Sequence, residues 1–310
     1  MKKKQNNWRK YGSIFAIVII LGSFIIYASL VVDTGGEKAY PLNDVTGTKT
    51  NFTLNAVKDG IKYVPEGVLA ITVVPADDKM NTSVGELFPG ATPSKLMTAI
   101  YNEGLVEFYG LQSTDNVSVM IEGKKPKYEK IGDYNVISTV TQGIFAGNPM
   151  IRVVFEGTDK SLVGKVANVL SGTSTGAKDF DAILNLADNV SDFEEIMVSK
   201  TKEGAQFSMI YQRESVFENG TSQLETIIYG PSAEFRTELK EFSEKEITNI
   251  TFTATEDELM FKLYINGTDA LAYQVIETSL HKLIDEHGET YEDAHEGHDH
   301  GTGHEGHNHG

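Results

Sequence analysis

The chain contains no cysteine, and its first 280 residues contain no histidine. The absence of cysteine excludes structural disulfides, thiolate catalysis, iron–sulfur clusters and cysteine-ligated zinc. Without histidine, residues 1–280 cannot build a Ser–His–Asp or Cys–His catalytic system, or a standard catalytic zinc site. We therefore expect no enzymatic activity, and the alternative is a hydrolase that uses paired carboxylates.

Two adjacent acid pairs, Asp77-Asp78 and Glu194-Glu195, are the candidates for such carboxylates. Neighbours in a strand point to opposite faces, so we interpret both pairs as solvated surface positions. The sequence has no EF-hand, P-loop or dinucleotide-binding glycine pattern. Residues 172–179 resemble a phosphate loop, but their spacing is wrong, and we interpret them as a linker.

Positive charge is scarce beyond the first ten residues. The formal net charge is −17, and five of the 27 Lys and Arg residues precede the first apolar run: Lys2, Lys3, Lys4, Arg9 and Lys10. The remainder of the chain has 22 Lys and Arg against 44 Asp and Glu, a net charge of about −22. Such a surface repels nucleic acid and disfavours docking on anionic lipid, because both depend on basic side chains.

Residues 14–32 form an uncharged apolar run between this basic cluster and Asp33. At about 1.5 Å per residue, a helix of this length spans about 28 Å, close to the thickness of the bilayer core. Basic residues that flank a span stay in the cytoplasm. The pattern predicts a single-pass membrane protein with its N-terminus cytoplasmic and its C-terminal part outside the cell.

Two other interpretations of this run remain open. A cleaved signal peptide would have a shorter apolar stretch and a small-x-small cleavage site, and residues 27–30 are a poor cleavage context. A pilin-type leader is the other interpretation, because residues 10–13 resemble a prepilin processing site ahead of an apolar helix. That resemblance implies a pilin-like filament subunit, although Tyr11 replaces the charged residue that usually precedes the glycine.

Seven N-glycosylation sequons agree with a location outside the cell. None lies in the first 32 residues, and their acceptors are Asn51, Asn81, Asn116, Asn189, Asn219, Asn249 and Asn266. Each is usable only if it is exposed outside the cytoplasm. Asparagine and threonine are also common in turns and edge strands, which is the simpler explanation. An acidic, sequon-rich, cysteine-free and anchored chain is typical of an archaeal surface glycoprotein.

Beyond the anchor, the pattern predicts an α+β fold of two related mixed repeats, for which a ferredoxin-like unit fits the element order. The expected parts are a basic segment (1–13), the anchor (14–32), a stalk (33–60), a first domain (61–171), a linker (172–180), a second domain (181–288) and a histidine-rich tail (289–310).

Short apolar or alternating segments predict strands and amphipathic segments predict helices. The expected strands are 68–74, 105–109, 117–121, 135–141, 151–155, 195–199, 206–211, 224–229, 247–255 and 259–265. The expected helices are 95–102, 159–170, 233–246 and 269–286.

The proposed repeats rest on one matched motif. Residues 151–159 and 261–269 each read as a strand followed by Gly-Thr-Asp and an amphipathic helix. The threonine and aspartate supply oxygens that cap a helix N-terminus. A Gly-Thr-Asp connection is also common by chance, which is the alternative explanation. The first half has an additional segment at about residues 123–150.

The tail holds a histidine repeat with a period of nine residues. Its candidate metal ligands are His295, His298, His300, His304, His307 and His309. Neutral imidazole binds Zn²⁺, Ni²⁺ and Cu²⁺, and interspersed glycines favour a disordered segment that can wrap an ion. An acidic solubilising tail that binds metal incidentally is the simpler alternative. His281, in a predicted helix, is more typical of a structural residue.

Three functions fit these observations. The sequence favours a non-enzymatic cell-surface protein that binds a membrane or surface partner or contributes to the envelope. A protein that captures transition metal and delivers it to a membrane transporter is the alternative that the tail supports. A filament subunit is the alternative that the leader-like segment supports.

Overall fold

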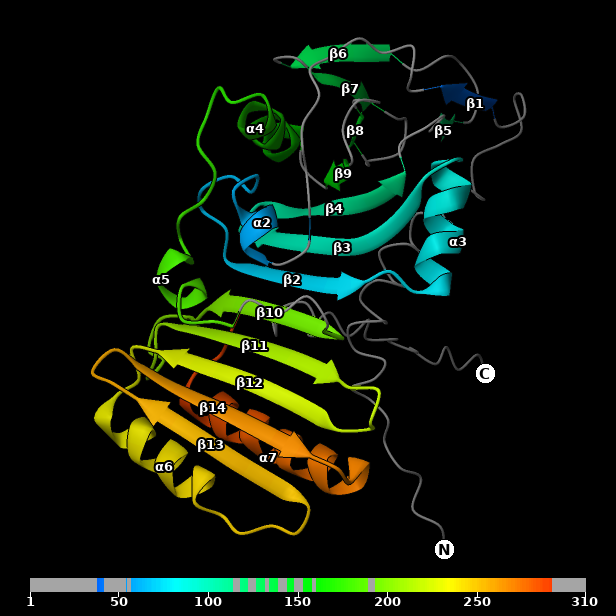
Figure 1. The fold of residues 1–310 in the computed structure, drawn as a ribbon. Helices are drawn as coiled ribbons and strands as arrows, with labels where there is room; N and C mark the ends of the chain where they lie inside the picture. The colour runs from blue at the N-terminus through cyan, green and yellow to red at the C-terminus, as the bar shows by residue number, and fades with distance from the viewer. Residues whose placement is uncertain are drawn as a thin grey trace, which may run out of the picture.

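A computed structural model describes residues 38–41, 54, 57–113, 118–121, 127–131, 134–138, 144–147, 153–157, 160–188 and 193–291. The fold is mixed α/β and is built on one antiparallel sheet (Figure 1). Twelve strands join in the order β13-β14-β12-β11-β10-β2-β3-β4-β9-β8-β7-β6, and a separate pair consists of β1 and β5.

The strands of the second half occupy the lower part of Figure 1. Hairpins join β10 to β11, β11 to β12 and β13 to β14, whereas the connection from β12 to β13 runs through α6 and places β14 between them. Their bounds are β10 Glu195–Lys200, β11 Met209–Val216, β12 Ser222–Tyr229, β13 Ile250–Glu256 and β14 Met260–Gly267. All of their pairings are antiparallel. The predicted strands 195–199, 224–229, 247–255 and 259–265 are confirmed with small shifts at their ends, whereas the predicted strand 206–211 overlaps β11 only at residues 209–211.

The first half is longer, because extra strands extend its outer edge. Its central strands are β2 Ala70–Pro75, β3 Thr92–Tyr101 and β4 Gly104–Ser113. The outer strands are β9 Val153–Gly157, β8 Ile144–Gly147, β7 Tyr134–Ser138 and β6 Lys127–Ile131. The separate pair is β1 Lys38–Pro41 with β5 Ser118–Ile121.

The two halves join through β2 and β10, which pair antiparallel with Val73 opposite Ile196 and Ile71 opposite Val198. All four side chains are buried on one face of the sheet, which we call face A. Alternate residues lie on the opposite face, face B, where Ile210 and Ile228 are buried. The strands of the two halves therefore belong to one continuous sheet, although the sequence predicts a linker between the halves.

Helices cover the two faces unequally. The helices that contribute to the core on face A are α2 Val57–Ile61, α4 Lys160–Leu170 and α5 Asp181–Leu184. The helices on face B of the second half are α6 Ala233–Ser243 and α7 Ala270–His287. Helix α3, Asp78–Leu87, packs against β3. The apolar residues of the predicted helices 159–170, 233–246 and 269–286 thus contribute to two separate cores.

The helix start signals hold for α6 and α7. Ser232 caps α6 by accepting a hydrogen bond from the Phe235 amide, and Asp269 caps α7 by accepting from Leu271 and Ala272. Such side-chain oxygens satisfy amides that have no partner within the helix. The Gly-Thr-Asp motif therefore starts α7 as predicted, and Ser232 starts α6 in the same way.

The predicted helix at 95–102 is wrong, because these residues form most of β3. This strand pairs with β2 on one side and β4 on the other, and its side chains are buried on both faces. Pairing on both sides and burial on both faces outweighed a weak local helical pattern. The helix of this region is α3, which begins at the Asp77 cap and precedes the predicted position.

The two halves share a strand order but not a helix arrangement. From the central pair outwards, the order is β2-β3-β4-β9-β8 in one half and β10-β11-β12-β14-β13 in the other. Helices α4 and α7 follow the matching strands β9 and β14, yet α4 belongs to the core on face A and α7 to the core on face B. If a twofold rotation between β2 and β10 related the two halves, α4 and α7 would lie on the same face of the sheet. They lie on opposite faces, so the halves are not related by such a rotation.

The residues of the predicted linker pack into the fold at their C-terminal end. Ala177 and Phe180 are buried, and the Ala177 amide donates to the Val64 carbonyl at 2.6 Å. A Cβ on Gly176 would overlap the Lys62 carbonyl oxygen, so only glycine allows this approach.

Among the helices of the described residues, none is both long and apolar enough to cross a bilayer. The predicted anchor at 14–32 and the predicted stalk residues before 38 lie outside the described part of the chain.

Candidate functional site

Four charged side chains meet on face A of the second half. Arg213 of β11 and Glu225 of β12 are almost fully buried and lie opposite each other. Lys262 of β14 reaches the same carboxylate, and Asp188 approaches from the segment after α5. Two positive and two negative groups balance, so the cluster is neutral overall. We call it the ion network.

Glu225 is at the centre of the ion network, and both of its carboxylate oxygens are used. Arg213 Nε donates to Oε2 at 2.9 Å, and Lys262 Nζ lies 2.8 Å from Oε1. The Asp188 amide also donates to Oε1, at 3.1 Å. A buried carboxylate is tolerated when it is paired and hydrogen-bonded in this way.

The two cations of the ion network make further hydrogen bonds. Arg213 donates to the Ser215 hydroxyl at 2.7 Å and to the Gln223 side-chain oxygen at 3.1 Å. Lys262 donates to the Leu186 carbonyl at 2.9 Å and to Asp188 at 3.0 Å. These bonds tie three strands to the segment at 186–188.

The pKa values of Lys262 and Asp188 favour the charged states of these two groups. Burial alone would lower the pKa of Lys262, but hydrogen bonds to Glu225, Tyr264 and Asp188 outweigh it and raise that pKa above its usual range. Burial would raise the pKa of Asp188, but hydrogen bonds from Lys262 and Tyr264 hold it below its usual range. Proton transfer near neutral pH is therefore unfavourable, and the ion network is suited to fixing structure.

An exposed polar strip adjoins the ion network on face A. Thr251, Thr253 and Thr255 of the edge strand β13 are exposed, and Thr253 lies opposite Tyr264. The Tyr264 hydroxyl donates to Asp188 at 2.8 Å, so the ion network fixes this ring. We call Thr251, Thr253, Thr255 and Tyr264 the threonine strip.

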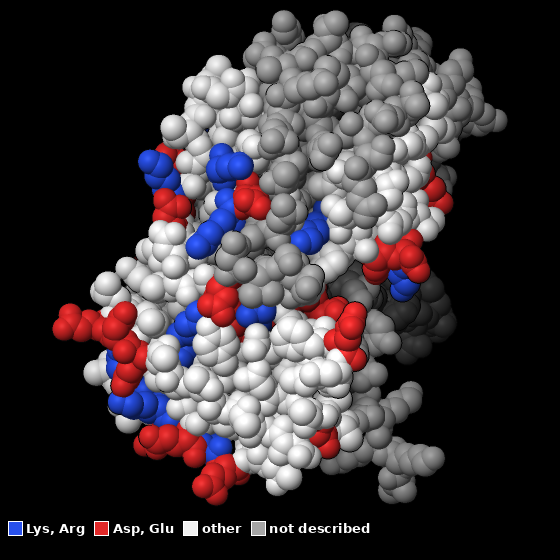
Figure 2. Space-filling view, viewed as in Figure 1, with Lys and Arg blue, Asp and Glu red and all other residues white. Residues whose placement is uncertain are grey.

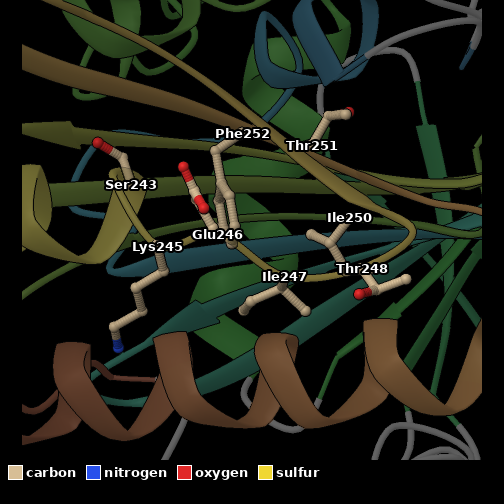
Figure 3. A pocket seen from close by; sticks show the side chains of 8 residues that line it. All are labelled: Ser243, Lys245, Glu246, Ile247, Thr248, Ile250, Thr251 and Phe252. Atoms are coloured by element: carbon tan, nitrogen blue, oxygen red, sulfur yellow. The ribbon is translucent and has the colours of Figure 1, made fainter.

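A shallow hollow lies at the start of β13, where the chain leaves α6 (Figure 3). Its lining residues are Ser243, Lys245, Glu246, Ile247, Thr248, Ile250, Thr251 and Phe252. Ile247 and Ile250 take part in the core on face B, so the floor of the hollow is apolar. One lysine and one glutamate at its rim do not form a catalytic arrangement.

His287 joins the two helices on face B. Its Nε2 lies 2.9 Å from the Glu238 carboxylate of α6, and its ring stacks on Phe235 with centroids 4.5 Å apart. Its Nδ1 is buried and has no hydrogen-bond partner. Prediction from the sequence singled out His281 and the tail but did not single out His287. His281 lies half-buried on α7.

The structure describes four of the seven predicted glycosylation sites. Asn219 lies in the β11–β12 turn and Asn249 precedes β13, and both are exposed. Asn81 lies on α3 and Asn266 on β14, and both are partly buried. The other three acceptors, Asn51, Asn116 and Asn189, lie outside the described residues.

The candidate ligands of the tail, from His295 to His309, also lie outside the described residues. The described part ends at Tyr291, whose amide donates to the Ser199 hydroxyl at 3.3 Å. Within that part, no group of three His, Asp or Glu side chains is placed to hold a metal ion.

The adjacent acids occupy surface positions. Asp77 and Asp78 are exposed at the start of α3, where Asp77 caps the helix by accepting from the Met80 amide. Glu194 is exposed just before β10, and Glu195 begins that strand. In the former phosphate-loop candidate, Asp179 forms an ion pair with Lys200 at 2.6 Å.

The ion network was missed, although its residues carry a signal. Glu225 and Lys262 each interrupt a run of apolar or β-branched residues, whereas Arg213 stands among polar neighbours. Charged side chains in such strands are buried only when paired. The sequence does not show which strands are neighbours, so it could not show which charges would meet.

Comparisons with known proteins returned no match: no family model, no curated protein and no solved structure is similar to this chain.

The face shown in Figure 2 carries acidic and basic side chains side by side. An uncharged area covers the middle of its lower part, where Figure 1 places the second half, and acidic and basic side chains line the left edge of that area.

Proposed function

We propose that this chain is a membrane-anchored, extracytoplasmic binding protein whose threonine strip contacts a partner protein. The observation that carries the proposal is the position of this exposed strip beside the ion network. The network holds Tyr264 and Asp188 in place. A preorganised surface loses less conformational entropy on binding than a flexible one.

Charge defines the kind of partner. The chain beyond residue 32 carries about −22, so electrostatic complementarity favours a protein surface that is positively charged. Tyrosine is enriched at protein interfaces because it combines a large apolar ring with a hydrogen-bonding tip. The strip offers Tyr264 among small hydroxyl side chains, without a bulky residue that would block close approach.

The test places a photo-reactive residue at Thr253 in the full chain, in cells, with the exposed Thr278 of α7 as the matched control position. We expect one discrete adduct from Thr253 and none from Thr278. Thr255→Lys should lower the yield and Thr255→Glu should preserve it, because the partner surface is basic. Equal labelling from both positions, or indifference to Thr255→Lys, would contradict the proposal.

Metal capture by the tail is a second candidate, supported by the repeated histidines and by the fixed point from which the tail leaves the fold. The backbone at Thr290 pairs with Thr201, and Lys202 forms an ion pair with Glu289 at 2.8 Å. Deletion of residues 294–310 should abolish Zn²⁺, Ni²⁺ or Cu²⁺ binding and impair growth under metal limitation. Binding by the full chain should weaken as the pH falls through about 6.5, because imidazole protonates. Unchanged growth of the deletion strain would rule out delivery.

We infer that the second half follows a ferredoxin-like element order. The order β12–α6–β13–β14–α7 is strand, helix, two strands and helix, and β11 lies beside β12 where the last strand of that unit would lie. The common strand order supports the proposal that the strands of the two halves are related repeats. Because α4 and α7 lie on opposite faces of the sheet, the proposed repeat does not include these helices.

A further inference from the structure

Three of the four described sequons converge on one end of the second half. Ser222, Gly267 and Ile250 form a row of neighbouring residues across β12, β14 and β13. Asn266 immediately precedes Gly267, Asn249 immediately precedes Ile250, and Asn219 lies in the turn before Ser222. These acceptors are therefore close in space, yet their surroundings differ.

Asn219 is at the tip of a hairpin. The turn is closed by the Phe217 amide donating to the Thr221 carbonyl at 2.9 Å, and Gly220 adopts a positive φ of 79°. The Asn219 side-chain oxygen accepts from the Thr221 amide at 3.0 Å. The exposed side chain can carry a large substituent without displacing any strand.

Asn249 is exposed where the chain enters β13. It is the described non-glycine residue with a positive φ, at 66°, a conformation that asparagine tolerates better than most residues. Its carbonyl accepts from the Thr268 amide at 3.2 Å, so the backbone is fixed while the side chain faces solvent.

The surroundings of Asn81 and Asn266 are less open than those of Asn219 and Asn249, because both residues are partly buried. The side-chain oxygen of Asn81 is buried on α3. Asn266 lies within β14 between two paired strands, and its side-chain oxygen accepts from Gln223 at 2.8 Å. Gln223 in turn accepts from Arg213 at 3.1 Å, so the Asn266 side chain is connected to the ion network.

We propose that Asn219 and Asn249 carry the N-linked glycans of this region and that Asn81 and Asn266 carry none in the folded protein. The proposal rests on the extracytoplasmic location. In the transfer step, Nδ2 attacks the anomeric carbon of a lipid-linked oligosaccharide phosphate. The nitrogen–carbon bond forms, the carbon–oxygen bond to phosphate breaks, and the lipid phosphate leaves while the nitrogen loses one proton.

The position of the two acceptors has a consequence for the surface. Val216 and Phe217, which precede Asn219 by a few residues, are 51% and 38% exposed. A hydrated glycan on Asn219 would shield these apolar side chains from contact with other chains. The tail leaves from the opposite end of β10 and β11, so the glycans would not obstruct it.

The experiment uses the full chain purified from membranes of a host that glycosylates exported proteins, with site-by-site mass spectrometry of its peptides. Thr221→Ala and Thr251→Ala should each remove one glycan, and Thr221→Ser, which keeps the sequon, should restore occupancy. Thr268→Ala and Ser83→Ala remove the sequons of Asn266 and Asn81 and should leave the mass of the glycans unchanged.

A glycan on Asn81 or Asn266 of the folded protein would overturn the assignment. Unmodified Asn219 and Asn249 in a chain that carries glycans at Asn51, Asn116 or Asn189 would overturn it while leaving the location intact. A chain without any glycan would also overturn it, and labelling of an exposed cysteine from outside the cell would show separately whether the location fails.

Discussion

The two halves of the sheet use one strand order to build different surfaces. In the first half, α4 covers face A and α3 packs against β3, so the central strands are buried on both faces. In the second half, α6 and α7 cover face B, and face A holds the ion network and the threonine strip. The helices thus decide which face of the same strand arrangement remains available.

The difference between the two halves is clearest at two buried glutamates, which lie on strands in corresponding positions of the sheet. Glu225 of β12 has two cations, whereas Glu107 of β4 accepts a hydrogen bond from the Tyr109 hydroxyl at 2.9 Å. The matching strands β12 and β4 thus both bury a carboxylate, but on opposite faces of the sheet. The comparison suggests that removing partners should cost more in the second half.

The largest effect should come from Arg213→Met. The change leaves buried Glu225 with Lys262 and the Asp188 amide but without its Arg213 partner, and breaking a buried ion pair costs about 3–5 kcal/mol of unfolding free energy. Urea denaturation of the purified protein measures it. Arg213→Met combined with Glu225→Leu should recover part of the loss, because no unpaired carboxylate remains. A double variant as unstable as the single one would show that the charges themselves are not the cause.

Gly176→Ala should follow, with a loss of about 2 kcal/mol, because a new Cβ would force the chain away from Lys62. The substitution tests how the halves are joined, since Gly176 belongs to the segment between them. Gly85→Ala on α3 is the matched control: its Cβ would meet no atom within 4 Å, and alanine favours a helix by about 1 kcal/mol. Equal effects of the two changes on the denaturation midpoint would refute the close approach.

Tyr109→Phe in the first half should cost about 1.5 kcal/mol, because it removes one hydrogen-bond donor from a buried carboxylate. The change keeps the ring and hence its packing. If its loss in urea denaturation matched that of Arg213→Met, the contrast between the two buried acids would fail.

The smallest effect should appear only in acid. The pKa of Asp188 is lowered on folding, so its contribution to stability is complete above the ordinary aspartate pKa of about 3.9 and disappears as the pH falls through its lower folded-state pKa. Asp188→Asn should therefore weaken the fall of stability at acidic pH. Melting temperatures measured between pH 2 and 6 would show this change. Its side chain is 46% exposed, so solvent screening keeps the effect small. An unchanged acid limb would contradict the lowered pKa.

The sequence predicted the second half well because its signals are local. The Ser232 and Asp269 caps and the alternation of β13 and β14 act within a few residues. In the first half, the predicted helix at 95–102 is wrong, because a strand that is buried on both faces lacks the alternation of apolar and polar residues that identifies a strand. The ion network depends on pairing between β11, β12 and β14, which local pattern does not specify.

The absence of cysteine allows the most direct test of the location. A single cysteine at the exposed Thr253, in the full chain, is treated in intact cells with a charged maleimide that cannot cross a membrane, and Lys4→Cys is the matched control. The account predicts that Thr253→Cys is labelled in intact cells and Lys4→Cys only after permeabilisation. Labelling of Thr253→Cys that requires permeabilisation would contradict it.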